Sequence, residues 1–313
     1  MAASEKVVVV TKKTGLEELI ERFNTREQAR FYLEHAGVSF ADYEASHAAY
    51  HKALATVKSG LPPGVRAQWI EREFVPNFTF GPEDFVVTVG PDGLVVNTAK
   101  YLDGQPLFAV NPDPARVDGV LIPFAAGEAA GRLRPALRGE FRRKRVTMAR
   151  VMLNDGQSLH AVNDFFLGQQ THQSARYRLE LDGQAEDQSS SGLIVSTGAG
   201  STGWLRSVLT GASGVIESFV PSDDVRAVRD RYGFDWEADY LCYSVCEPFV
   251  SRASSAQLVF GHVEAGQVLE ITSQMPQNGV IFSDGIEDDF LQFNSGSIAR
   301  IGVAEKRANL IVG

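Results

Sequence analysis

Residues 189–207 read SSSGLIVSTGAGSTGWLRS, and this stretch decides how the fold of the chain is interpreted. Its apolar run from Leu193 to Val195 is typical of a buried strand, and it leads directly into a turn made of Gly, Ser and Thr. Such a turn presents backbone N–H groups and hydroxyls without bulky side chains, so it suits the phosphate or the ribose of a nucleotide. On composition alone, an ordinary surface loop is the favoured interpretation.

Two upstream segments carry further polar groups at the ends of strands. Residues 85–102 read FVVTVGPDGLVVNTAKYL, in which a β-branched run stops at a Gly-Pro-Asp-Gly turn and helical spacing begins at Leu94. This segment predicts a strand, a tight turn with one carboxylate, and a helix. Residues 161–168 read AVNDFFLG, where Asn163 and Asp164 interrupt a strand with side chains able to hydrogen-bond an adenine edge or ribose hydroxyls.

In this order the three segments resemble the NAD kinase family, whose signatures are GGDGT, an Asn-Glu pair, and a Gly/Thr-rich segment after a strand. The resemblance is closest to the mitochondrial-type branch, since SSGL followed by a T-G-x-G-S turn and a Trp is the variant of that branch. It extends over most of the chain. The turn Asn111-Pro112-Asp113-Pro114 resembles the N-x-D-P turn of the branch, and Phe293 to Ile301 resembles its C-terminal strand.

The resemblance implies roles for particular residues. Asp92 would act as the catalytic base, accepting the proton of a ribose hydroxyl as that oxygen attacks the terminal phosphorus of ATP. The other residues implied to bind the nucleotides are Gly90, Gly93, Asn163, Asp164, Thr202, Gly203, Ser207 and Asp284. Four of these residues have a structural alternative. Asp92 and Asp284 fit turn residues, the second in a hairpin, and Asn163 and Asp164 fit a polar bulge.

The chain departs from the family pattern at three positions. Pro91 stands where the family has a second Gly and lacks a backbone N–H that could face phosphate. Leu94 replaces a Thr and loses its hydroxyl, and Asp164 replaces a Glu with a side chain one methylene shorter. The first two changes weaken the ATP side of the motif. Trp204 fits equally a ligand-side aromatic and a core residue.

The order of strand and helix signals predicts two domains. Up to Lys144 strands alternate with helices, which favours a Rossmann-like parallel α/β sheet, and from Arg145 strand follows strand. We therefore expect an α/β nucleotide-binding domain at 1–144, a β-rich NAD-binding domain at 145–300, and a segment at 301–313 able to return to the first domain. The resemblance places the active site between the two domains. The polar stretch Gln184 to Ser191 reads as a mobile loop, and residues 211–239 as a helix-containing excursion.

Composition fits an enzyme of this kind. The chain has 313 residues, 44% of them hydrophobic, a formal net charge of −9 and a pI near 5.3, which argues against a nucleic-acid surface. The basic stretch Arg132 to Arg150 is interpreted as a solvated face and an interdomain connection. The alternative is positive charge near a phosphate-bearing ligand or an acidic partner subunit. Neither a membrane span nor a secretory signal is apparent, so we expect a cytoplasmic protein without membrane contact. Cys242 and Cys246 fit buried thiols.

The sequence thus predicts a kinase that uses ATP and Mg²⁺ to phosphorylate NAD at the adenosine-side 2′-hydroxyl, working as a homodimer or homotetramer. The alternative is a non-catalytic sensor that binds NAD(P) or another adenine nucleotide and has lost ATP use. A lipid or sugar kinase fits less well, because two of the segments resemble dinucleotide features. No side chain is assigned to a metal: the acidic run Glu287-Asp288-Asp289 fits a solvated loop, and His47 and His51 fit a surface pair without a third ligand.

Overall fold

The computed structural model describes residues 6–220 and 222–313, without the side chains of residues 229–231, 287 and 288. The chain divides into two compact units. The first runs up to Lys144 and also includes Asn309–Gly313, and the second comprises Arg145–Ala308. Among the described residues no helix is both long and apolar enough to cross a membrane.

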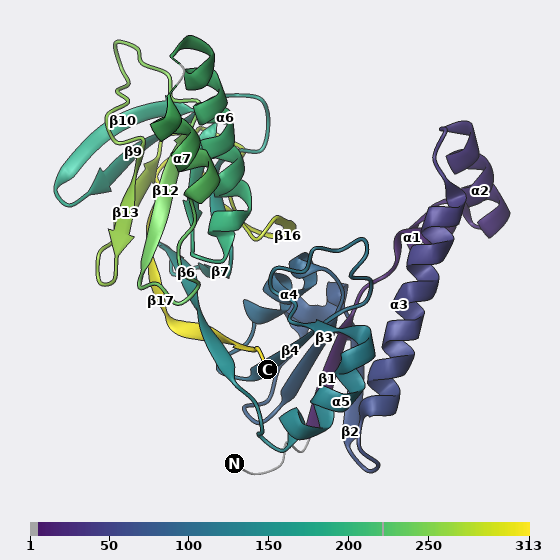
Figure 1. Cartoon of the computed structure of the whole chain (residues 1–313). Coiled ribbons are helices and arrows are strands. Elements are labelled where there is room, and N and C mark those ends of the chain that lie inside the picture. The colour runs from purple at the N-terminus through teal and green to yellow at the C-terminus, as the bar shows by residue number, and fades with distance from the viewer. Residues whose placement is uncertain (1–5, 221) are drawn as a thin grey trace. The chain divides into compact units, whose positions relative to one another are not determined.

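The first unit is built on a parallel sheet in the order β2-β1-β3-β4, with the end of β17 (Ile298–Ile311) beside β4 (Figure 1). Val7 to Val10 of β1 are completely buried, as expected for a central parallel strand covered on both faces. Helices α3 and α5 pack against the sheet through a core that includes Val57 and Leu133. The elements are β1 (Lys6–Thr11), α1 (Gly15–Phe23), α2 (Arg26–His35), α3 (Phe40–Gly60), β2 (Arg66–Glu71), η1 (Arg72–Asn77), β3 (Phe85–Val89), α4 (Asp92–Ala99), β4 (Pro106–Asn111), β5 (Phe124–Ala125) and α5 (Ala126–Leu137).

The second unit is β-rich and almost entirely antiparallel. One group of strands runs β10-β9-β14-β17, with β6 beside β17 and β7 beside β6, and a separate sheet runs β13-β12-β11-β8-β15-β16. Inward-facing residues of both sheets, among them Phe165, Tyr177 and Leu193, share one buried core. The strands are β6 (Arg143–Leu153), β7 (Ser158–Ala161), β8 (Asp164–Gln169), β9 (Ala175–Leu181), β10 (Gln184–Ser190), β11 (Gly192–Ser196), β12 (Tyr240–Cys246), β13 (Phe260–Glu264), β14 (Leu269–Ser273), β15 (Gly279–Ser283), β16 (Ile286–Gln292) and β17 (Ile298–Ile311).

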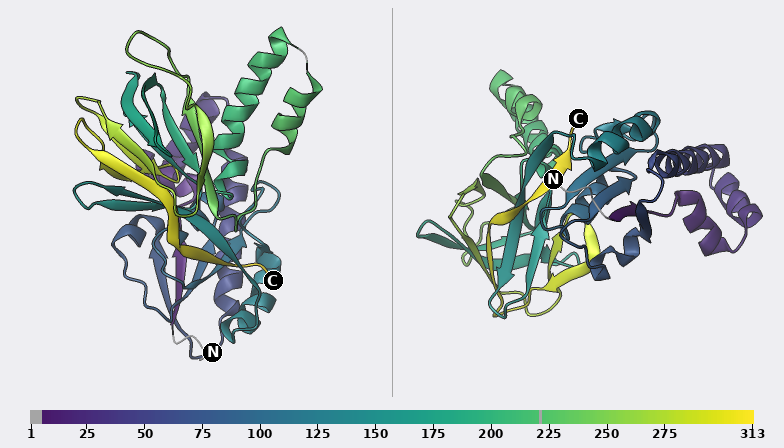
Figure 2. Two further views of the ribbon diagram at one scale, coloured as in Figure 1. Left: turned by 90° about the vertical axis from the view of Figure 1, so that its left-hand side faces the viewer. Right: turned by 90° about the horizontal axis from the view of Figure 1, so that it is seen from below.

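Two helices interrupt the strands of the second unit. Helix α6 (Trp204–Phe219) follows the one-turn helix η2 (Gly200–Thr202), and α7 (Asp223–Arg231) packs beside it. Figure 2 shows this helical pair extending away from the strands. The helix-containing excursion that the sequence predicts is therefore confirmed.

The structure corrects three local predictions. Residues 184–190 form β10, an edge strand paired with β9, so the expected loop is wrong. The strand expected through residues 161–168 is in fact two strands, because the chain turns at Val162 and Asn163 between β7 and β8. The C-terminal strand begins at Ile298, after a turn. The fold class is nonetheless the predicted one: an α/β unit with a parallel sheet and a β-rich unit.

Candidate functional site

The Gly-Pro-Asp-Gly turn joins strand β3 to helix α4 in the first unit. Pro91 is the N-cap residue of α4 and Asp92 its first residue, so the helix begins two positions before the predicted start at Leu94. Gly90 donates its backbone N–H to the carbonyl of Val110 at 3.1 Å. A Cβ on Gly90 would lie 2.7 Å from Cδ2 of Leu94, which shows that the leucine side chain covers this glycine. Space around Gly93 is open.

Asp92 is half-buried and its carboxylate holds the loop at 112–123. Oδ1 accepts the N–H of Leu121 at 2.7 Å, and Oδ2 accepts that of Val120 at 3.2 Å. Each carboxylate oxygen offers two acceptor positions, so both keep one for another donor. The residue is thus a structural anchor at the first position of α4. A catalytic role stays a prediction.

The Asn111 turn shapes the other side of this loop. The side chain of Asn111 donates to the carbonyl of Val117 at 2.9 Å and accepts the N–H of Asp113 at 3.0 Å. Gly119 has a φ of 67°, and a Cβ there would lie 2.6 Å from the Asn111 amide nitrogen. The loop that supplies both donors to Asp92 is therefore itself held in place.

In the second unit, the structure brings Asp284 to the Asn163-Asp164 corner. One carboxylate oxygen of Asp284 accepts the backbone N–H groups of Val162, Asn163 and Asp164, at 3.1, 2.7 and 3.3 Å. Asp284 also donates its own N–H to the carbonyl of Asp164 at 3.0 Å. It occupies the two-residue turn between β15 and β16 with a φ of 54°. Asp284 is therefore a hairpin residue that also binds the backbone of the predicted Asn163-Asp164 pair.

Two side chains at this corner have unusual chemistry. Asp164 is only 7% exposed, and its burial together with the negative charge of Asp284 raises its pKa to about 7. The Oδ1 atom of Asn163 is buried and has no hydrogen-bond partner. Buried acceptors are normally satisfied, so this oxygen marks a place where a ligand donor fits.

Replacing Asp164 by Asn is expected to stabilise the protein at about pH 8 by about 2–4 kcal/mol, because Asn is isosteric and uncharged. Below about pH 4 the carboxyl is protonated in both folded and unfolded chains, so the gain disappears there. It grows as the pH rises from about 4 to the folded pKa of about 7, because over that range the unfolded chain has lost the proton that the buried acid still keeps, and it is constant at higher pH. Urea denaturation at both pH values measures this difference.

Asp155→Asn is the matched control, since hydrogen bonds from Gln157 lower the pKa of that exposed carboxyl. No stabilisation at about pH 8 is expected for it. An equal gain in the two variants, or a gain for Asp164→Asn that is independent of pH, would be incompatible with a buried acid at position 164.

The Gly-rich turn after β11 packs tightly against the same corner. Thr197 donates its N–H to the carbonyl of Asn163 at 2.9 Å and its hydroxyl to that of Val162. The Thr197 hydroxyl and carbonyl accept the N–H groups of Gly200 and Ser201. A Cβ on Gly200 would lie 2.2 Å from the Asn163 carbonyl oxygen. The N–H groups of Thr197, Gly200 and Ser201 and the Thr197 hydroxyl are therefore used in packing, so the expectation of free donors is wrong for this part of the turn.

The exposed end of the turn carries the remaining predicted residues. Thr202 and Ser207 direct their hydroxyls to the carbonyls of Ala199 and Gly203, at 3.3 and 3.4 Å, and all of Thr202, Gly203 and Ser207 are exposed. These weak, local bonds leave the hydroxyls able to exchange partners with a ligand. Their contacts with a dinucleotide stay predictions.

Trp204 lies beside an aromatic row that the sequence argument missed. Its ring stacks on Phe166 with centroids 5.3 Å apart, and Phe166 stacks on Phe282 at 6.4 Å. Trp204 is 43% exposed, so it is not a core residue. The signal was present in the sequence, since Phe166 follows Asp164 by two positions on one strand and Phe282 closely precedes Asp284.

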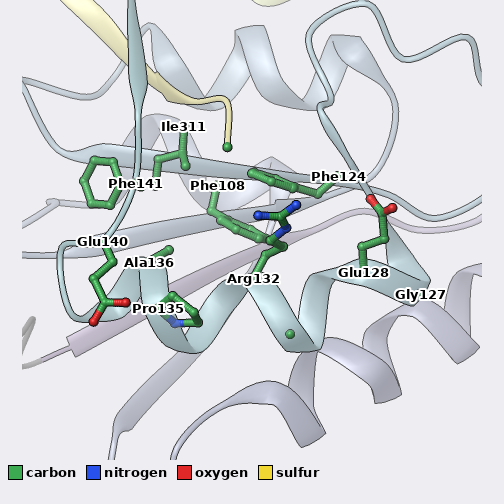
Figure 3. Close-up of a pocket in the computed structure, with 12 residues that line it drawn as sticks. Phe108, Phe124, Gly127, Glu128, Arg132, Pro135, Ala136, Glu140, Phe141 and Ile311 are labelled. Atoms are coloured by element: carbon green, nitrogen blue, oxygen red, sulfur yellow. The ribbon is translucent and has the colours of Figure 1, made fainter.

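The first unit contains a hollow of about 540 Å³ that none of these residues lines (Figure 3). Its lining includes the stacked rings of Phe108 and Phe124, with Arg132 of α5 beside them. Of the basic stretch, Arg138 is exposed and paired with Glu140 at 2.7 Å, and β6 begins at Arg143. The hollow contains none of the predicted site residues. The acidic side chains of Glu287 and Asp288 lie outside the described residues.

Comparison with known proteins gives a consistent picture. The chain is 25% identical over 319 residues to "NAD kinase 2, mitochondrial" of Rattus norvegicus, covering 80% of this chain and 75% of the relative. It is 26% identical to the protein of the same name from Homo sapiens, over 80% of this chain and 72% of the relative. No protein-family model matches.

Two solved structures share the fold. Yeast NADH kinase complexed with NADH superposes with a TM-score of 0.59 at 14% identity, covering 98% of this chain and 83% of that one. An NAD kinase from Archaeoglobus fulgidus in complex with ATP gives a TM-score of 0.56 at 17% identity, covering 97% of this chain and 92% of the other.

Proposed function

We propose that the chain is a member of the NAD kinase family and that it transfers the terminal phosphoryl group of ATP to the 2′-hydroxyl of the adenosine ribose of NAD. The observation that carries this proposal is the corner at which Asn163, Asp164 and Asp284 meet. There an unpartnered buried amide oxygen and an acid with a pKa of about 7 lie on adjacent residues.

We assign dinucleotide binding to this corner and to the exposed end of the Gly-rich turn. The Asn163 amide oxygen suits the exocyclic amine of adenine or a ribose hydroxyl, both of which are donors. An ionised Asp164 accepts from a hydroxyl, and its burial strengthens that bond. Thr202, Gly203 and Ser207 contact the rest of the dinucleotide in this proposal, with Trp204 offering a half-exposed ring.

In this proposal Asp92 is the general base that accepts the proton of the 2′-hydroxyl. As the 2′-oxygen forms its bond to the terminal phosphorus, the bond from that phosphorus to the ADP oxygen breaks, and the hydroxyl proton passes to the Asp92 carboxylate. The N–H groups of Val120 and Leu121 orient the carboxylate for this step. Gly90 and Gly93 are proposed to bind near the phosphates, where open space around Gly93 leaves room.

Mg²⁺ is proposed to arrive with ATP. It takes carboxylate oxygens together with substrate phosphates, and it neutralises the charge of the triphosphate. Both Asp92 oxygens already accept a backbone N–H. The described residues of this turn therefore fit a Mg²⁺ ion whose ligands are mainly phosphate oxygens of the nucleotide. By resemblance to its family, the protein is proposed to work as a homodimer or homotetramer.

A nucleotide sensor is the second candidate, and the ATP side of the motif favours it. Pro91 offers no N–H, and Leu94 is 1% exposed and fills the place above Gly90. The test is NADP⁺ formation from NAD⁺ and Mg-ATP, followed with an NADP⁺-specific dehydrogenase. Product formation establishes the kinase. Saturable NAD⁺ binding without product would establish the sensor.

A further inference from the structure

A cluster of metal-ligating side chains lies on α1 and α3 of the first unit. Glu17, His47 and His51 each offer one donor atom, and these atoms all lie within 4.8 Å of one another. The two histidines are four residues apart on α3 and so share one face of that helix. The third ligand comes from α1 and is distant from both histidines in sequence. None of the three has a role in the proposed nucleotide chemistry.

The carboxylate of Glu17 is held in place by the start of its own helix. Its Oε2 atom accepts the backbone N–H of Thr14 at 2.7 Å and the Thr14 hydroxyl at 3.0 Å, while Thr14 Oγ1 accepts the N–H of Glu17. This reciprocal capping arrangement fixes one oxygen. The other, Oε1, faces Nε2 of His51 at 3.0 Å.

The same threonine also contacts His47, with Thr14 Oγ1 lying 2.9 Å from Nδ1 of the ring. When the Thr14 hydroxyl donates its single proton to Glu17, this contact is made by a hydrogen on Nδ1. In that tautomer Nε2 of His47 keeps its lone pair, the state in which imidazole binds a metal. A hydrogen bond from the other ring nitrogen to a fixed oxygen is the usual support of a metal-bound histidine.

Stabilisation of the fold does not account for this arrangement. His51 is 47% exposed and its Glu17 partner 34%, and an ion pair in so much solvent contributes little. The rings of His47 and His51 lie edge to face with centroids 4.2 Å apart, so two imidazoles are held side by side next to one carboxylate.

We propose that Glu17, His47 and His51 form a zinc site, with the remaining coordination position open to water. Two imidazole nitrogens and one carboxylate oxygen suit Zn²⁺ better than Mg²⁺ or Ca²⁺, which prefer oxygen ligands alone. Zinc replaces the hydrogen bond between His51 and Glu17 and links α1 to α3. The site is separate from the Asp92 turn in its residues and requires no nucleotide.

Metal-free full-length protein titrated with Zn²⁺ against a chromogenic chelator tests the proposal. One Zn²⁺ is expected per chain, with a rise in thermal midpoint. Glu17→Gln and His51→Gln should each weaken affinity by about tenfold or more and abolish that rise. Gln at position 17 retains the capping arrangement, so the helix start is preserved.

His35→Gln is the control, because His35 is an exposed histidine of α2 outside the cluster. Its affinity for Zn²⁺ should equal that of the wild type. Zinc binding that is unchanged in Glu17→Gln and His51→Gln, or no stoichiometric binding by the wild type, would overturn the site.

Discussion

Asp92→Asn is expected to lower kcat for NADP⁺ formation by about 10²- to 10⁴-fold. The amide cannot accept the proton of the ribose hydroxyl, whereas the carboxylate can. Its oxygen still accepts one of the two N–H groups of the loop, but its NH₂ group must face the other donor. Steady-state rates at saturating NAD⁺ and Mg-ATP measure the effect, and a thermal midpoint shows how much of it is structural.

Asp113→Asn provides the comparison. Asp113 belongs to the same loop and pairs with Arg116 at 2.7 Å in partly exposed surroundings. We expect it to retain most of the wild-type kcat. If Asp92→Asn kept more than about a tenth of the activity, general-base catalysis by this residue would be refuted.

Gly200→Ala is expected to destabilise the protein by about 3 kcal/mol. The added Cβ would lie 2.2 Å from the carbonyl oxygen of Asn163, which is backbone and cannot rotate away. The change should also weaken NAD⁺ binding, because it displaces the corner that carries the Asn163 amide. Urea denaturation and NAD⁺ titration of the same preparation measure both effects.

Gly211→Ala is the matched substitution in α6, where nothing beyond the backbone of the helix itself lies within 4 Å of the new methyl group. It should stabilise the helix by about 0.5–1 kcal/mol. If the two alanine variants were equally stable, the tight packing of the Gly-rich turn would be contradicted.

Elements with strong local signals could be predicted from the sequence. Val7 to Val10 form the buried parallel strand that their continuous apolar run indicates. The strand at 184–190 was missed because it lies at a sheet edge, where polar side chains face solvent and β-propensity is low. Edge position depends on pairing with β9, which no local pattern reports.

The candidate site was predicted as separate segments, but not as an assembly. That Asp284 binds the N–H groups of residues 162–164 follows from the pairing of β15 with β8, which is distant in sequence. The raised pKa of Asp164 depends on the same proximity and on burial. Glu17 likewise meets His47 and His51 only through the packing of α1 on α3. Such contacts are set by tertiary structure.

Transfer of label from [γ-³²P]ATP to NAD⁺ in a single turnover is the most direct test of the proposed kinase. Label is expected to appear in NADP⁺ at the adenosine 2′-position, in proportion to the ADP formed. Label that stayed in ATP or appeared only as inorganic phosphate, while NAD⁺ was bound, would contradict phosphoryl transfer to NAD by this chain.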